Sequence, residues 1–71
     1  MGSKLRARIT VDSSGRIIGT GGAASMIGAR EASEWGNRSV EVTIEDREGN
    51  VIKRETMSVN ELYKKVRRGV L

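Results

Sequence analysis

Apolar and polar residues alternate over residues 5–12. Every second residue from 5 to 11 is apolar, and the residues between them are Arg or Thr, which is the pattern of a strand with one buried face. Residues 12–15 combine Asp, Ser and Gly, which favour a tight turn. Residues 16–18 then predict a short return strand, so the stretch predicts a β-hairpin.

The same alternation returns over residues 39–45, with Val40, Val42 and Ile44 on one side. Residues 46–50 predict a second turn, and residues 51–56 a second return strand. Residues 10–18 resemble residues 43–52, with one extra residue in the second turn. This echo indicates two ββα units of about 33 residues each.

Between the hairpins the pattern favours a helix. The glycines of residues 19–22 are predicted to break the first return strand, and a helix is predicted over residues 23–35, ending at Gly36 in the left-handed conformation. At 100° per residue its small residues and one aromatic residue form a stripe that would lie close to a sheet. The stripe consists of Ala24, Gly28, Ala29, Ala32 and Trp35.

The last element has the strongest local signals. Ser58 followed by Glu61 is a capping box, and Met57 is placed to pack on Leu62 as a hydrophobic staple. Gly69 is placed to end the helix. Its apolar face consists of Val59, Leu62, Tyr63, Val66 and Val70.

Together these elements predict one α+β domain over residues 4–71 with the order ββαββα. We expect a mainly antiparallel four-stranded sheet with both helices on one face. The other face would be polar, formed by Arg6, Arg8, Thr10, Glu41, Thr43 and Glu45.

Composition limits the function further. The chain of 71 residues has no Cys and no His, so we expect no disulfide, no cofactor and no metal site, and no general base to activate a Ser or Thr nucleophile. No stretch is apolar enough for a membrane helix or a secretory signal, which favours a cytoplasmic binding protein rather than an enzyme. Trp35 and Tyr63 are the only aromatic residues, and a homodimer sharing one core would ease this shortage.

The net charge of +4 comes from 13 basic and 9 acidic residues, and basic domains favour polyanions. Four cations cluster in the last helix, where they could contact phosphates: Lys64, Lys65, Arg67 and Arg68. The same cations would also complement the dipole at the end of that helix. Both interpretations stay open.

Arg6 and Arg8 on the open sheet face are a second candidate for nucleic-acid contact. The alternative is that Glu41, Glu45 and Glu55 pair with these cations across the sheet.

Two further stretches have competing interpretations. The glycines of residues 19–22 precede a helix and could bind an anion or simply connect the elements. Met26 and Ile27 could form an exposed patch for a protein partner, or Ile27 could belong to the core.

Residues 22–52 resemble, in outline, the helix-then-hairpin layout of small phage proteins, including some anti-CRISPR proteins. The likeness involves the Ala- and Ser-rich residues 23–32 and the hairpin of residues 42–52. Residues 56–62 are similar to the Ser-capped helix that follows a hairpin in phage head-completion proteins. The resemblance implies a protein of a phage or another mobile element and assigns no site.

The sequence therefore predicts a small binding protein that engages nucleic acid or a nucleoprotein complex through its basic residues. A protein-binding inhibitor of a host complex, resembling the anti-CRISPR proteins, is the alternative. A structural subunit that assembles through sheet edges is a third.

Overall fold

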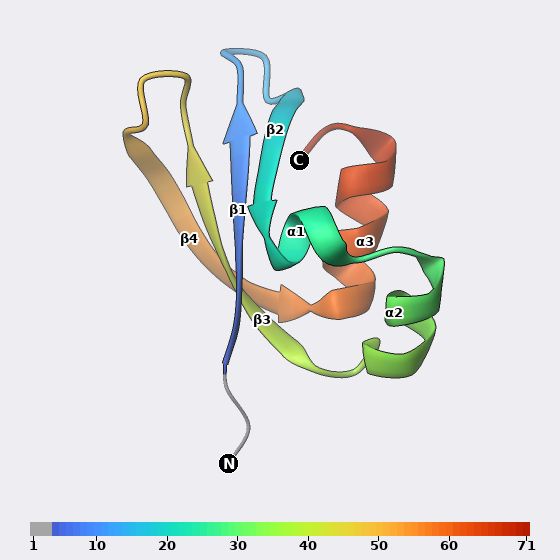
Figure 1. Cartoon of the computed structure of the whole chain (residues 1–71). Coiled ribbons are helices and arrows are strands. Elements are labelled where there is room, and N and C mark those ends of the chain that lie inside the picture. Colours follow the sequence, from blue (N-terminus) through green and yellow to red (C-terminus); the bar gives the residue numbers. More distant parts are fainter. Residues whose placement is uncertain (1–3) are drawn as a thin grey trace.

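The computed structural model describes residues 4–71. In this part of the chain a four-stranded sheet carries three helices on one face (Figure 1). The elements are β1 (Leu5–Val11), β2 (Ile17–Gly22), α1 (Ala23–Met26), α2 (Ala29–Trp35), β3 (Ser39–Glu45), β4 (Val51–Ser58) and α3 (Val59–Arg68).

The strands lie in the order β2-β1-β3-β4. The central pair, β1 and β3, is parallel, whereas the two hairpin ladders are antiparallel. The predicted α+β class and the element order are confirmed, and the sheet is mixed.

The period-two pattern places the core as predicted. Ile9, Val40 and Ile44 face the helices and are almost completely buried, and among residues 4–71 no polar or charged residue is buried. The strand register puts Arg6, Arg8, Glu41 and Thr43 on the opposite, helix-free face, which we call the outer face. This face is polar, as the alternation predicts.

The single helix predicted over residues 23–35 is wrong, because the chain breaks between α1 and α2. Ile27 is extended, with φ −83° and ψ 113°, and its half-buried side chain packs against the core. The Gly28 N–H donates to the Glu31 carboxylate at 2.9 Å, which starts α2 afresh with a cap. The low helix propensity of Gly28, together with the new cap that it forms with Glu31, therefore outweighs the helical spacing of the small residues. The predicted left-handed end is also wrong, since Gly36 has φ −55°.

The prediction that glycines break the first return strand is wrong as well. β2 continues to Gly22, with Gly21 opposite Arg8 and Gly19 opposite Thr10. The ladder with β1 holds these residues extended despite their low strand propensity. α1, which follows them, has only four residues.

The two hairpin turns are equal in length, contrary to the extra residue predicted for the second. In each, the Asp carboxylate accepts backbone N–H bonds two and four residues later, Asp12 from Ser14 and Arg16 and Asp46 from Glu48 and Asn50. These bonds lower the pKa of both carboxyls, chiefly through the Ser14 side chain for Asp12 and the Asn50 backbone for Asp46.

The equivalent strand residues of the two hairpins nevertheless face opposite sides of the sheet. Val11 pairs with Ile17 and points into the core, whereas Glu45 pairs with Val51 at the same place in the second hairpin and points outward. The extra residue therefore lies in the strand before the turn. Val51 is left exposed as a result, whereas its equivalent Ile17 packs against the core.

α3 forms as predicted. The Glu61 N–H donates to the Ser58 hydroxyl at 3.2 Å, and the Ser58 N–H donates to the Glu61 carboxylate at 3.3 Å. Gly69 ends the helix with φ 75°, and its N–H donates to the carbonyl oxygens of Lys65 and Val66. The Ile17 N–H then donates to the Gly69 carbonyl at 2.7 Å, so the end of α3 is attached to the start of β2.

Candidate nucleic-acid interface

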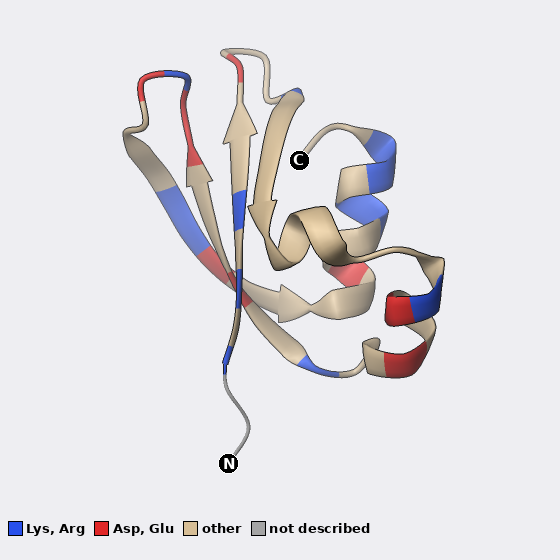
Figure 2. Ribbon diagram, in the orientation of Figure 1, with Lys and Arg blue, Asp and Glu red and all other residues tan. Residues whose placement is uncertain are grey.

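The four predicted cations of α3 lie in its C-terminal half. Lys64, Arg67 and Arg68 are exposed, and Lys65 is half-buried. Within residues 4–71 none of the four forms an ion pair with a carboxylate. Figure 2 shows these basic segments of α3 in blue. Glu61, the one acidic residue of α3, lies in the first turn of the helix, away from them. The cations are therefore uncompensated.

The amphipathic pattern of α3 explains this arrangement. Val59 and Leu62 are fully buried against the sheet, which turns the polar side of the helix to solvent. Glu61 is used in the N-terminal cap, and Lys65, Arg67 and Arg68 lie in the last turn, where cations complement the helix dipole. The same cations would thus stabilise the helix and contact phosphates.

Arg67 is held by a neighbour on the same helix. Its Nη1 donates to the Tyr63 hydroxyl at 2.8 Å, and its guanidinium carbon lies 5.6 Å from the centroid of the Tyr63 ring. The hydrogen bond to Tyr63 raises the pKa of Arg67. Arg67 is therefore a permanent and positioned charge.

The cations of the outer face have a different environment. Lys4 Nζ lies 2.8 Å from Glu41 Oε2, and Arg6 Nε lies 3.9 Å from Glu41 Oε1. Arg8 Nη2 lies 3.3 Å from Glu45 Oε1. The hydrogen bond from Lys4 lowers the pKa of Glu41. The predicted cross-strand pairs with Glu41 and Glu45 are thus present.

Glu55 takes no part in these pairs. It lies opposite Val42 and so faces the helix side of the sheet, where it is 3.1 Å from Lys53. The structure separates the two predicted basic sets, because Arg6 and Arg8 lie on the outer face and α3 lies in the helix layer. One flat ligand could not cover both.

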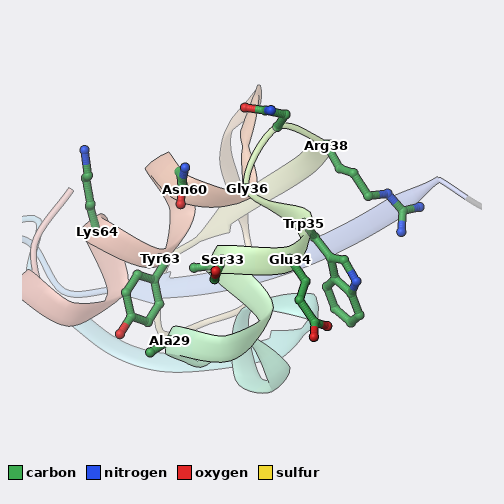
Figure 3. Close-up of a pocket in the computed structure, with 11 residues that line it drawn as sticks. Ala29, Ser33, Glu34, Trp35, Gly36, Arg38, Asn60, Tyr63 and Lys64 are labelled. Atoms are coloured by element: carbon green, nitrogen blue, oxygen red, sulfur yellow. The ribbon is translucent and has the colours of Figure 1, made fainter.

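A groove between α2 and α3, which we call the α2–α3 groove, is absent from the sequence predictions. The Val59 N–H donates to the Arg38 carbonyl at 2.9 Å, and the Asn60 N–H to the Gly36 carbonyl at 3.3 Å. A Cβ on Gly36 would lie 2.6 Å from the Asn60 side-chain nitrogen, so glycine allows this close approach of α2 and α3. The groove has a volume of about 510 Å³, and Figure 3 shows its lining.

Met26 and Ile27 separate in the structure. Met26 is 68% exposed, whereas Ile27 packs against the core. Both contribute to an apolar hollow of about 270 Å³ that Leu5 and Trp35 also line. The break after α1 causes the separation, because it turns Ile27 inward.

Residues 4–71 contain no group of three or more acidic, His or Cys side chains placed to hold a metal ion. In the same part of the chain, no helix has the length and apolar character needed to cross a bilayer.

No protein-family model, no curated protein and no solved structure matches the chain. Its function must therefore be inferred from the geometry and charge of its own residues.

Proposed function

We propose that this chain is a small, non-catalytic binding protein that engages nucleic acid, alone or in a nucleoprotein complex, through α3. The observation that carries this proposal is the set of four uncompensated cations in the C-terminal half of α3. Phosphodiesters are the polyanion that such a row of cations suits best, because each neutralised phosphate releases counterions.

The distribution of charge supports α3 over the rest of the surface. Five of the 13 basic residues form ion pairs within residues 4–71, namely Lys4, Arg6, Arg8, Arg30 and Lys53. The α3 cluster is half of the remaining eight, held within five consecutive positions. We assign Arg6 and Arg8 a secondary role, since each must leave a glutamate before it can bind a phosphate.

The experiment compares two variants that lose the same charge. In the α3 variant, Lys64, Lys65, Arg67 and Arg68 are replaced by Gln. In the control, Arg6, Arg8, Lys53 and Arg54 are replaced by Gln. Binding of labelled duplex DNA and RNA is measured by fluorescence anisotropy at low salt, after circular dichroism has shown that both variants fold.

We expect the α3 variant to lose about tenfold or more in affinity and the control about threefold or less, because only α3 offers free cations in a row. Equal losses would show that net charge alone attracts the nucleic acid. An unchanged affinity in the α3 variant would reject the proposal.

A protein-binding function is the second candidate, favoured by the exposed Met26 beside the apolar hollow. An inhibitor of a host complex, as the likeness to anti-CRISPR proteins suggests, would act in this way. This function predicts no nucleic-acid binding by the chain alone. It also predicts a co-purifying protein that a Met26→Lys substitution releases.

A further inference from the structure

We propose that the α2–α3 groove is a subsite for single-stranded nucleic acid, in which one unstacked base lies against Tyr63 while Lys64 and Arg67 hold the flanking phosphates. This inference rests on the proposed function and deepens it, because it names the form of nucleic acid that α3 selects. Its ligand chemistry is an aromatic base joined to an anionic backbone.

The groove has the size for such a ligand. Its volume of about 510 Å³ falls in the range of roughly 300–1,000 Å³ for small-molecule sites. One end is closed where Asn60 meets Gly36. Figure 3 shows Asn60, Tyr63 and Lys64 projecting from α3, and Ala29 and Ser33 from α2. The two helices therefore provide its walls.

The groove also offers hydrogen-bonding groups that the described chain does not use. Among residues 4–71, the side chains of Ser33, Asn37 and Asn60 make no hydrogen bond to another protein group. A side-chain amide presents a donor and an acceptor side by side, as does the edge of a nucleobase. The lining thus suits a base better than a purely apolar ligand.

Its charge favours an anion. Lys64 and Arg38 line the groove and form no ion pair within residues 4–71. Glu34, the acidic residue of the lining, is 3.4 Å from Arg30 and is compensated by it. Arg67 adds a further cation through its contact with Tyr63. An acidic peptide would satisfy the cations but would place no aromatic group against the ring of Tyr63.

The position of Tyr63 favours a single strand over a duplex as the ligand. Its half-buried ring lines the groove, and its hydroxyl accepts from Arg67, which fixes the ring next to a guanidinium. Aromatic rings and Arg planes are the surfaces on which unpaired bases stack. A base within a duplex cannot reach such a ring, because both of its faces are already stacked. We therefore expect a preference for single strands.

The test measures strand preference. Labelled oligothymidylate and oligouridylate of roughly 12 nucleotides and a duplex of the same length are titrated against the full chain. Tyr63→Leu should weaken binding of both single strands about tenfold, since stacking contributes about 1–3 kcal/mol per base. Its duplex affinity should change about twofold or less. Tyr63→Phe keeps the ring and should retain the single-strand affinity.

Asn60→Asp provides a second variant that does not depend on Tyr63. Residue 60 is in the first turn of α3, where a carboxylate is favourable to the helix, so this substitution should not impair folding. The new charge inside the groove should weaken single-strand binding more than duplex binding. A fall for oligouridylate alone would identify RNA as the ligand, and equal falls would include DNA.

The inference is overturned if Tyr63→Leu and Asn60→Asp lower single-strand and duplex affinity equally, or if neither lowers it. In both cases the proposed function still stands if the α3 variant loses nucleic-acid binding. If acidic peptides compete with oligothymidylate at equal concentration, the groove recognises charge rather than a base, which also contradicts the inference.

Discussion

The two basic surfaces of this protein differ in what surrounds their cations. On β1, Arg6 and Arg8 are highly exposed, with 79% and 68% of their side chains accessible, yet each lies near a glutamate of β3. On α3 the cations have no carboxylate partner within residues 4–71. Exposure alone therefore does not identify the interface. The parallel register of β1 and β3 brings opposite charges together on the sheet, and the helix has no such neighbour.

Salt dependence should show the largest contrast between these surfaces. If α3 contacts four phosphates, a tenfold increase in salt should weaken duplex binding by about three and a half orders of magnitude. The Arg6→Gln/Arg8→Gln variant should keep this slope, whereas the α3 variant should lose most of it. Anisotropy titrations at several salt concentrations measure both. If the two variants lost the same part of the salt dependence, the two surfaces would contribute equally to binding.

Releasing the outer-face cations should produce the next largest effect. Glu41→Gln together with Glu45→Gln frees Lys4, Arg6 and Arg8, and we expect nucleic-acid affinity to rise about tenfold through the new phosphate contacts. Exposed ion pairs contribute little to stability, so the fold should tolerate both changes. An unchanged affinity would mean that the ligand never approaches this face.

Removing the cap of α3 should have a smaller effect, and mainly on stability. Ser58→Ala leaves the Glu61 N–H without its acceptor and should lower the free energy of unfolding by about 1 kcal/mol. Urea denaturation measures the change. Ser58→Asp keeps an acceptor at the cap and should restore most of the loss, while a loss with Asp equal to that with Ala would show that the cap bond does not matter.

The smallest effect should appear at acid pH. The pKa of Glu41 is lowered by Lys4, so the pair stabilises the fold above the unfolded pKa of about 4.3. That contribution is lost as the pH falls through the lower folded pKa. Glu41→Gln should therefore reduce the dependence of the free energy of unfolding on pH in that range, as urea denaturation at several pH values would show. The pH dependence that remains in this variant should come from Asp12 and Asp46, whose pKa values are also lowered.

Local signals predicted the parts of the fold that depend on near neighbours. The capping box of Ser58 and Glu61 and the alternation in β1 and β3 appear as expected, because each is set by residues a few positions apart. The extension of β2 through its glycines depends on the ladder with β1, and the inward position of the Ile27 side chain depends on its contact with the core. Local propensity cannot supply those contacts.

The candidate site also has features that depend on near neighbours and features that depend on distant contacts. The cations of α3 could be identified from the sequence, because they lie within one helix. That these cations lack carboxylate partners could not be predicted from the sequence, because it depends on the strand order. The α2–α3 groove was missed because it joins residues about 30 positions apart, although the polar residues Asn37 and Asn60 at two predicted element boundaries offered a weak signal.

α3 is hydrogen-bonded to other segments at both of its ends, where the Val59 N–H donates to the Arg38 carbonyl before β3 and the Gly69 carbonyl accepts from the Ile17 N–H of β2. These bonds oppose fraying of the helix ends when a ligand binds. Little backbone freedom would then be lost on association, so even a small contact area could give useful affinity. Residues added after Leu71 would extend from the same anchor, and a tag placed there would crowd the basic end of the helix.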